Sequence, residues 1–484
     1  MGIHNFHKWL TGKYPQSKIN KQDLTGQCEN MFIDLNFLLH YCSYGINIGD
    51  EHTLFHRITN NITFLINMFK PKNSVTLVTD GSPPLAKLIT QRKRRILMSR
   101  KDEMECIDQL KLTVGTQFME SLSKKLHNYI ENTKKKYNIN ITTIFHQPNE
   151  AEINIIHKIN NKEPNEKNII ISNDADVIVL SCASLNNKNI YVVNINPGKK
   201  IIVYSIGKIL ELFINEYKGN NLDFVFMMLL MGNDYLPKVY YISFDILLKS
   251  FNKGKSLINI IDNLCVFNNK NLINYFINLI SYIPKQMLYR YKLGNYNHHK
   301  IKYYLEGLNW CITNYSTGTC LKYDYMYTHG SIDPFDILYF LEFNTKININ
   351  YPHPPFPSID KDIYPILILP KKAISLINPK YHNLIKNEPK IQFLYEEEEC
   401  DICKELHIDI GNIHKNIKNI QLNVQLEAES KDMEIDEEYL ADLILPYKKK
   451  LGNLGSRFEK HKLSHKPINL IDIYNAIDII KTSV

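Results

Sequence analysis

Acidic residues stand where predicted strands end and predicted helices begin. Asp34 ends the apolar run that starts at Met31, and Asp80 follows the β-rich segment Val75–Val78. Others come in pairs spaced by two residues, or after an apolar helix. The full set is Asp34, Asp80, Glu150, Glu152, Asp174, Asp176 and Asp234. Because the carboxyl ends of parallel strands meet at one edge of a sheet, we expect these carboxylates to converge.

Converging carboxylates indicate a divalent metal site. Several negative charges in one place repel one another unless cations neutralise them. Hard oxygen ligands favour Mg²⁺, with Mn²⁺ as the alternative. Two such ions about 3.5–4 Å apart can hold the attacking water and the leaving oxygen of a phosphodiester, so no protein general base is expected. Any one of these acids alone is more often a turn or cap residue, and the interpretation therefore depends on the whole set.

A basic and amide stripe follows directly after the Asp80 segment. Its members lie on the predicted helix Leu85–Arg100, and they are Lys87, Gln91, Arg94 and Arg95. Offsets of four, seven and eight residues from the first member put all of them on one helical face. Arginine suits phosphate oxygens because its guanidinium binds them in a bidentate way. A charge run is usually a solvated surface, but its position after Asp80 favours an anion site.

Short apolar runs alternate with helical patterns in the first half of the chain. The expected strands are Met31–Asp34, Val75–Val78, Ile141–Phe145, Asn168–Ser172 and Ile190–Ile195. The expected helices are Leu54–Phe69, Leu85–Arg100, Gln117–Tyr137 and Glu150–Ile159. This alternation predicts an α/β fold, with a mostly parallel twisted sheet flanked by helices.

The composition is that of a protein with a normal hydrophobic core. The chain has 484 residues and a net charge of +8, which fits a nucleic-acid partner without requiring one. Nine cysteines at irregular spacings suggest reduced thiols. No apolar run is long enough for a membrane span, and the first residues carry no leader pattern. We therefore expect a cytoplasmic protein without a membrane partner, although the nucleus or a viral factory stays open.

These motifs, in this order, resemble those of the XRN family of 5′→3′ exoribonucleases, which are related to the flap endonucleases. The resemblance spans about residues 1–390, and any single motif in it is weak. It rests on the ordered segments Met1–Leu10, Asp34–Cys42, Asp80–Arg95, Gly115–Met119, Pro148–Glu152, Asn173–Asp176, Asp223–Pro237 and Tyr304–Trp310.

The resemblance implies a function and a role for each site residue. The chain would degrade single-stranded RNA from a 5′-monophosphate end, processively and as a monomer, to mononucleotides. The acidic set would hold two Mg²⁺ ions. The stripe from Lys87 to Arg95 would bind the 5′-phosphate, and His40 would stack on the terminal base, an interaction that tolerates any sequence.

The resemblance also implies three parts of the chain. Residues 1–245 would form the catalytic nuclease domain with a PIN/flap-nuclease-like core. Residues 246–390 would form a second, largely helical region that wraps this core and completes the pocket. Residues 391–484 would be a charged C-terminal extension.

The sequence departs from the family pattern at several positions. The family pairs its histidine with a tryptophan, but the stretch 318–327 has none, so Tyr323 or Tyr325 could take that place. His4 stands where the family usually has proline, which leaves duplex unwinding open. Cys400 and Cys403 form a CxxC pair, half of a recognisable zinc pattern and by itself weak.

Two other functions share part of these features. A flap-type, structure-specific DNA nuclease would carry the same acids, but it usually has a Gly-rich helix-hairpin-helix after the last one, and no such pattern follows Asp234. A catalytically inactive RNA-binding relative would have lost some of the acids, and all of them are present here.

Overall fold

The computed structural model describes residues 3–46, 49–99, 109–196, 200–261, 264–284, 296–344, 357–395, 401–430, 437–462 and 470–483. The sequence predictions for Arg100 and for the side chains of Cys400 and Cys403 lie outside this part. The chain divides into two compact units, Met1–His382 and Asn383–Val484. The three-part division expected from the sequence stays a prediction.

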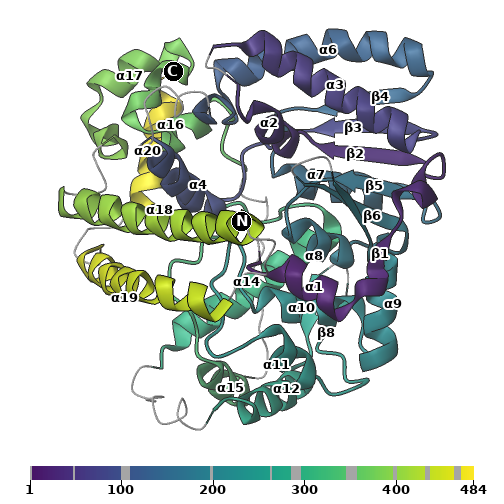
Figure 1. Ribbon diagram of the computed structural model, residues 1–484, viewed down its shortest axis with the longest axis vertical. Helices are drawn as coiled ribbons and strands as arrows, with labels where there is room; N and C mark the ends of the chain where they lie inside the picture. The colour runs from purple at the N-terminus through teal and green to yellow at the C-terminus, as the bar shows by residue number, and fades with distance from the viewer. Residues whose placement is uncertain are drawn as a thin grey trace. The chain divides into compact units, whose positions relative to one another are not determined.

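A seven-stranded sheet forms the centre of the first unit (Figure 1). Its order is β1-β7-β6-β5-β2-β3-β4, and the strands from β6 to β4 in this order run parallel. At one end of the sheet, β7 pairs with β6 and with the edge strand β1 in the antiparallel sense. The strands are β1 (Lys18–Ile19), β2 (Asn30–Asp34), β3 (Ser74–Val78), β4 (Asn140–Ile144), β5 (Asn168–Ile171), β6 (Ile190–Ile195) and β7 (Ile201–Ser205). The predicted α/β class with a mostly parallel sheet is confirmed.

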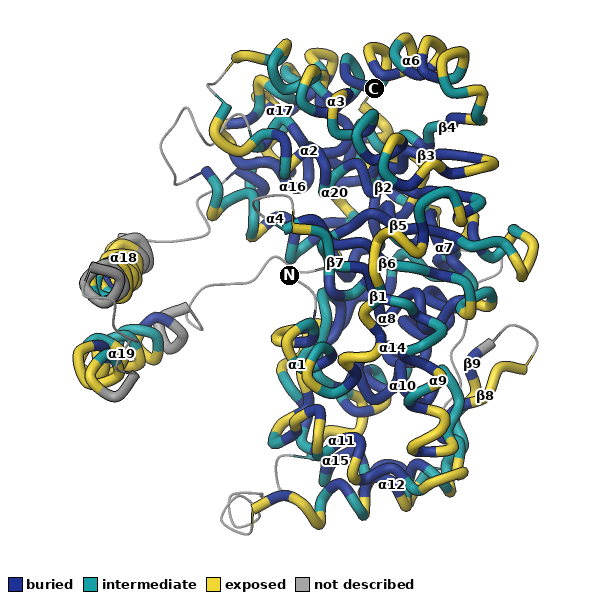
Figure 2. Tube along the Cα trace, turned by 45° about the vertical axis from the view of Figure 1, so that its right-hand side comes forward, coloured by how far each residue is buried: buried dark blue, intermediate teal, exposed yellow. Residues whose placement is uncertain are grey.

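The inner strands are buried on both faces (Figure 2). Successive side chains of β2 alternate between two cores: Met31 and Ile33 pack into one, and Phe32 into the other. Strand β5 does the same, with Ile170 opposite its neighbours. Alternation of apolar residues on both faces is what a parallel sheet covered by helices requires.

Different helices cover the two faces. One core includes residues of α2 (Leu35–Ser43), α3 (Glu51–Phe69) and α6 (Gln117–Tyr137). The helices whose residues enter the other core include α1 (Phe6–Lys13), α7 (Ala151–Asn160), α8 (Asp176–Ala183), α9 (Ile206–Tyr217) and α10 (Asn221–Leu229). The chain runs from β2 outward to β4 and then crosses to β5, so the direction changes between β2 and β5. Such a point opens a crevice at the carboxyl ends of the strands.

The second half of this unit packs against the sheet domain. Its elements are α11 (Phe244–Lys249), β8 (Ile258–Ile261), β9 (Leu264–Phe267), α12 (Asn269–Ser281), α14 (His298–Thr317), α15 (Pro334–Phe343) and α16 (Tyr364–Ile368). Helix α14 is buried along most of its length and contacts α7, α8 and α10. Helix α16 packs on α4 (Leu85–Met98), which carries the basic stripe.

The second unit is helical in its described part. After α17 (His382–Asn387) it contains α18 (Asp401–Ser430), α19 (Glu437–Lys462) and α20 (Leu470–Thr482). Helices α18 and α19 pack together through a small apolar cluster that includes Leu406 and Phe458. Across the described residues, no helix has the length and apolar character that a membrane crossing needs.

Candidate active site

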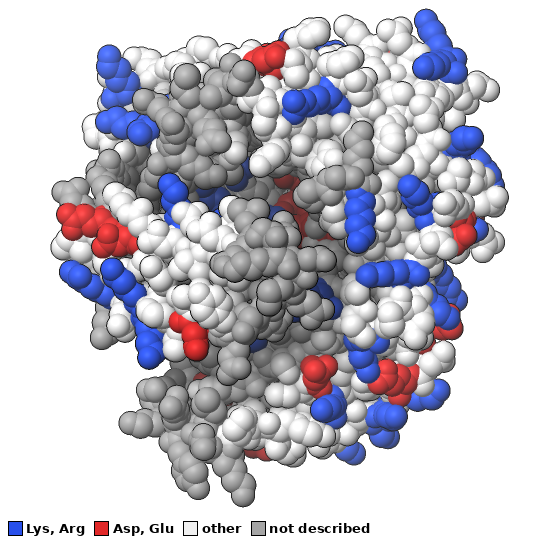
Figure 3. Space-filling view, viewed as in Figure 1, with Lys and Arg blue, Asp and Glu red and all other residues white. Residues whose placement is uncertain are grey.

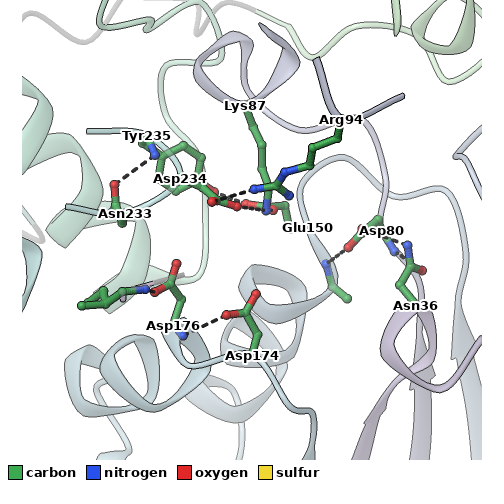
Figure 4. A network of polar contacts seen from close by, with 12 residues as sticks. Asn36, Asp80, Lys87, Arg94, Glu150, Asp174, Asp176, Asn233, Asp234 and Tyr235 are labelled. Carbon is green, nitrogen blue, oxygen red and sulfur yellow. Dashed lines mark hydrogen bonds and ion pairs between the residues drawn. The ribbon is translucent and has the colours of Figure 1, made fainter. Parts of the chain in front are cut away.

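Four neighbouring parallel strands deliver most of the acidic set to one place. Along the sheet, β5, β2, β3 and β4 are adjacent, and each is followed by acids of the set. Asp34 is the last residue of β2, and Asp80 lies two residues beyond β3. Asp234 arrives separately, from the loop after α10. Figure 4 shows five of these acids close to one another, namely Asp80, Glu150, Asp174, Asp176 and Asp234, as expected for the carboxyl edge of the sheet.

Asp34 is held at the crevice between β2 and β5. It caps helix α2, since one carboxylate oxygen accepts from the Phe37 N–H at 3.0 Å. The other oxygen accepts from Ser172 Oγ, just beyond β5, at 2.9 Å. The side chain is 5% exposed. Both oxygens are therefore oriented by neighbours that follow the two strands flanking the crevice, one in α2 and one just beyond β5.

Asp80 joins the β3 loop to the start of α7. Asn36 Nδ2 donates to one carboxylate oxygen at 2.8 Å, and the Ala151 N–H donates to the other at 2.9 Å. The loops that carry Asp80 and Glu150 also pair through their backbones, because the Gly81 N–H donates to the Asn149 carbonyl at 2.7 Å. A Cβ at Gly81 would overlap the Gln147 carbonyl oxygen. Glycine is thus required for this close approach.

The pair Asp174 and Asp176 is fixed by the loop after β5 and by the start of the chain. The Asp176 N–H donates to Asp174 Oδ1 at 3.1 Å, which turns both carboxylates toward the same side. The backbone N–H of Ile3 donates to Asp176 Oδ1 at 2.9 Å. Close by, His7 bonds the Asn173 backbone. The N-terminal segment therefore orients this acidic loop.

Cationic side chains of α4 reach into the same cluster. Lys87 forms ion pairs with Glu150 and with Asp234, the latter at 3.2 Å (Figure 4). Arg94 pairs with Asp234 at 2.8 Å. The Tyr235 hydroxyl also donates to Glu150. Two predicted metal ligands and two predicted phosphate ligands are thus in direct contact with one another.

Burial and mutual repulsion decide the charges of the acids. Burial, reinforced by Asp80, raises the pKa of Asp34 to about 7. Burial, reinforced by Asp174, raises the pKa of Asp176 to about 7. The pKa of Glu152 is raised well above its ordinary value by burial and by Asp34 and Asp80.

The remaining charges respond to the ion pairs. Burial alone would raise the pKa of Asp234, but Lys87 and Arg94 outweigh burial and lower it. Burial would lower the pKa of Lys87, yet Asp234 and Glu152 raise it. A buried site whose acids resist ionisation is one that an added cation would stabilise.

Five of the seven acids line a small recess, and Asp34 and Asp80 are not among its lining residues. The cavity measures about 20 Å³, and its lining combines Lys87, Glu150, Glu152, Asp174, Asp176, Asp234, Tyr235 and Tyr315 with two aliphatic side chains. That volume suits roughly one water molecule. In the described part of the chain, no three acidic, histidine or cysteine side chains are close enough to hold a metal as they stand. The donors are oxygens of the kind Mg²⁺ takes, so they fit such an ion in type once the Lys87 ion pairs open.

On the molecular surface, acidic residues are visible at the bottom of a hollow with basic residues beside them (Figure 3). Much of the basic stripe is also enclosed by protein. Lys87 and Gln91 are buried, and Arg95 Nε donates to Thr113 Oγ1 at 3.3 Å. Arg92 is 2% exposed and donates to the Leu367 carbonyl at 2.9 Å. The alternative interpretation of the charge run as a solvated surface is therefore wrong for this residue. Arg94 Nε is buried without a hydrogen-bond partner among the described residues. Such a free donor is what an anion site provides.

The candidate residues for base stacking differ in their exposure. The His40 side chain is exposed at the surface. Even so, desolvation by the surrounding protein and the nearby charge of Arg95 lower the pKa of its imidazole. Tyr325 is 2% exposed, so it lies in the core and is not open to a base. Tyr323 is half-buried, and its carbonyl accepts from the Leu85 N–H at the start of α4 at 2.8 Å. Of the two tyrosines, only Tyr323 remains accessible beside the stripe.

Sequence reasoning missed several residues that orient the acids. They are Ile3, Asn36, Ser172 and Tyr235. Asn36, Ser172 and Tyr235 lie within two residues of an acid of the set, which is the signal that could have found them. Ile3 contacts the site only through the tertiary fold.

Comparison with known proteins gives a sequence match over the first part of the chain. Residues 1–195 match the family described as XRN 5′-3′ exonuclease N-terminus. 5′-3′ exoribonuclease 1 of Schizosaccharomyces pombe is 25% identical in an alignment 297 residues long that covers 49% of this chain and 22% of that protein. The same-named protein of Saccharomyces cerevisiae is 25% identical in an alignment 317 residues long that covers 52% and 21% of the two chains. The chain spans about a fifth of the length of these relatives.

Solved structures give a weaker likeness. The catalytic core of Rad2 in complex with DNA has a TM-score of 0.37 and 15% identity, covering 76% of this chain and 100% of that one. Human GEN1 in complex with Holliday junction DNA has a TM-score of 0.31 and 15% identity, covering 49% and 52%. The sequence comparisons are the stronger finding, and they confirm the resemblance that the motifs indicated: residues 1–195 are similar to the N-terminal region of the XRN 5′-3′ exonuclease family.

Proposed function

We propose that the chain is a 5′→3′ exoribonuclease that hydrolyses single-stranded RNA from a 5′-monophosphate end, processively, to mononucleotides. The observation that carries this proposal is the direct apposition of the acidic cluster and the α4 cations. Lys87 and Arg94 contact Glu150 and Asp234. A terminal phosphate held by α4 would therefore have its first phosphodiester next to the carboxylates.

The acidic set would hold two Mg²⁺ ions, or Mn²⁺ in their place. When bound, such ions activate water and stabilise the leaving oxygen of a phosphodiester. The protein orients the carboxylates beforehand: Ser172 holds Asp34, Asn36 holds Asp80, and the Ile3 N–H holds Asp176. Preorganised ligands save the cost of ordering them during the reaction.

The α4 stripe would select the 5′ end. Arg94 Nε is a buried donor without a partner, and Gln91 and Arg95 lie on the same helical face. Tyr364 of α16, whose buried hydroxyl also lacks a partner among the described residues, lies close enough to Arg95 to interact with it electrostatically. A walled site of this kind would accept one phosphate group and leave little room for a triphosphate or a cap.

His40 would stack on the terminal base, and Tyr323 is the accessible aromatic residue for its other face. Stacking on aromatic rings is worth about 1–3 kcal/mol per base and does not depend on sequence. The chain would act on RNA without sequence preference and as a monomer. We place this activity in the cytoplasm as part of the proposal.

A time course on one end-labelled, unstructured RNA tests the proposal. The RNA is offered in Mg²⁺ with a 5′-monophosphate or a 5′-triphosphate, beside a DNA of the same sequence. We expect rapid loss of the monophosphate RNA alone, with release of mononucleotides. Internal or junction cleavage, or equal attack on DNA, would indicate the flap-type DNA nuclease. No cleavage with Mg²⁺ or Mn²⁺ would indicate an inactive RNA-binding relative.

A further inference from the structure

A tyrosine hydroxyl reaches the acidic recess beside the α4 cations. Tyr235 lies in the loop between α10 and α11, is 8% exposed, and donates to a carboxylate oxygen of Glu150. Its backbone is fixed as well, because the Tyr235 and Leu236 N–H groups both donate to Asn233 Oδ1, at 2.9 and 2.8 Å. The loop therefore sets where this hydroxyl points.

The ring of Tyr235 is held by the second half of the unit. It meets Trp310 of α14 edge to face, with ring centroids 5.2 Å apart and an interplanar angle of 88°. Trp310 stacks on Tyr325 at 4.9 Å, and its Nε1 donates to the Lys322 carbonyl at 3.0 Å. Aromatic pairs in these geometries are favourable and directional. A packed column of rings thus ends at Glu150.

A phenol differs from Lys87 as a partner of Glu150. The ammonium of Lys87 competes with any cation that approaches the carboxylate, whereas a neutral hydroxyl does not. A phenol is protonated at neutral pH and can donate without carrying a charge. The Tyr235 hydroxyl thus holds Oε2 of Glu150, while Lys87 pairs with Oε1. A cation that displaced Lys87 would find this carboxylate still oriented by Tyr235.

We infer that Tyr235 is a positioning residue: by donating to Glu150, it orients this carboxylate to bind a divalent cation. The inference rests on the proposed metal-dependent function and adds to the acidic set a neutral residue, which directly follows Asp234 in the sequence. Partners that orient metal ligands in this way typically change metal affinity or activity by about 10- to 100-fold when they are removed.

Metal binding without RNA tests this role directly. Mn²⁺ binding to the full chain is followed by the electron paramagnetic resonance signal of free Mn²⁺, for wild type and Tyr235→Phe. This substitution keeps the ring against Trp310 and removes only the hydroxyl. We expect Mn²⁺ to bind about tenfold more weakly, and the Mg²⁺ concentration for half-maximal RNA cleavage to rise by a similar factor. Activity at saturating Mg²⁺ should largely recover.

Two further variants make the test specific. Tyr275→Phe removes another buried phenol, one that donates to the Leu247 carbonyl at 3.2 Å in α11, and should leave Mn²⁺ affinity unchanged. In a Glu150→Gln background, Tyr235→Phe should have no additional effect on Mn²⁺ affinity, because the partner through which it acts is gone.

Equal Mn²⁺ affinities of wild type and Tyr235→Phe would overturn the inference and leave the proposed function intact. An equal loss in Tyr275→Phe would also overturn it, since the effect would then be general destabilisation. A wild-type chain that binds no Mn²⁺ would overturn the metal-dependent function itself, and the role of Tyr235 with it.

Discussion

Asp174 is the acid whose charge can be removed with the least change in shape. Its Oδ1 accepts from the Asp176 N–H, and an asparagine in its place keeps an oxygen for that bond. We expect Asp174→Asn to lower RNA turnover at least about 100-fold, because a lost metal ligand costs at least as much as a lost partner of one. Binding of 5′-monophosphate RNA should persist, as measured by fluorescence anisotropy.

Glu211 supplies the matched control for this charge change. It lies on α9 with its side chain 54% exposed, paired with Lys208. Glu211→Gln removes one carboxylate from the same unit and should leave turnover unchanged. Full activity of Asp174→Asn would remove this residue from the metal site.

Arg94 and Arg95 should determine the preference for a monophosphate end. Replacing both with alanine removes two guanidinium groups, and hydrogen bonds to charged groups contribute about 1.5–3 kcal/mol each. We expect the ratio of cleavage rates for monophosphate and triphosphate RNA to fall at least about tenfold. Lys93→Ala, an exposed position on the same helix, should not change that ratio. An unchanged ratio in the double variant would mean that the phosphate binds elsewhere.

At the scale of elements, the contact between the β3 loop and the start of α7 holds Asp80 beside Glu150. Gly81 allows this contact, because any side chain there meets the Gln147 carbonyl. We expect Gly81→Ala to push the two loops apart, lowering both the melting temperature and the turnover. Overpacking of this kind costs about 1–3 kcal/mol.

Gly12 provides the comparison for that substitution. It lies inside α1, and a Cβ there has no atom within 4 Å. Gly12→Ala should keep or slightly raise the melting temperature, since alanine is the better helix former. If Gly81→Ala is as harmless as Gly12→Ala, the close approach of the two loops does not position the acids.

The helices, strands and acidic residues of the site were predictable from the sequence, whereas the contacts that orient the acidic side chains were not. The β2 strand and Asp34 follow from a short apolar run that ends in an acid, and the α4 stripe follows from helical spacing. The bond from Ile3 to Asp176 joins residues far apart in the chain, as does the bond from Tyr235 to Glu150. Local patterns do not encode such contacts, because tertiary packing creates them.

The choice of the base-stacking residue was limited in the same way. The absence of tryptophan in 318–327 left Tyr323 and Tyr325 equivalent from sequence alone. Packing separates them, because the Tyr325 hydroxyl donates to the Tyr303 carbonyl at 2.9 Å and passes close to Gly307, where a Cβ would collide with it. Tyr325 therefore belongs to the column of rings behind Tyr235.

At the scale of the whole molecule, all residues of the site lie within the unit Met1–His382. The sheet supplies most of the acids. The region after residue 245 supplies Trp310, whose ring packs against Tyr235, and α16, which packs on α4. Repulsion among the buried acids destabilises the folded unit, and the size of this effect depends on pH. Its stability should therefore respond to pH and metal together.

The raised pKa values of Asp34 and Asp176 fix the direction of that response. Both lie at about 7 in the folded protein against an ordinary value of 3.8, so the folded state binds protons more tightly. The stability that these groups contribute is fully present below about pH 4 and is lost as pH rises through about 7. Because of these two groups, the metal-free protein should melt at a lower temperature at pH 8 than at pH 6.

Mg²⁺ should reverse this trend, because it binds the ionised carboxylates and competes with protons for them. We expect the rise in melting temperature on replacing EDTA with Mg²⁺ to be larger at pH 8 than at pH 6 by about 3 °C or more, which corresponds to roughly 3 kcal/mol in a chain of this size. Differential scanning fluorimetry at matched ionic strength, with NaCl in place of MgCl₂ as the control, measures both values. An equal rise at the two pH values would mean that Mg²⁺ does not bind at Asp34 and Asp176.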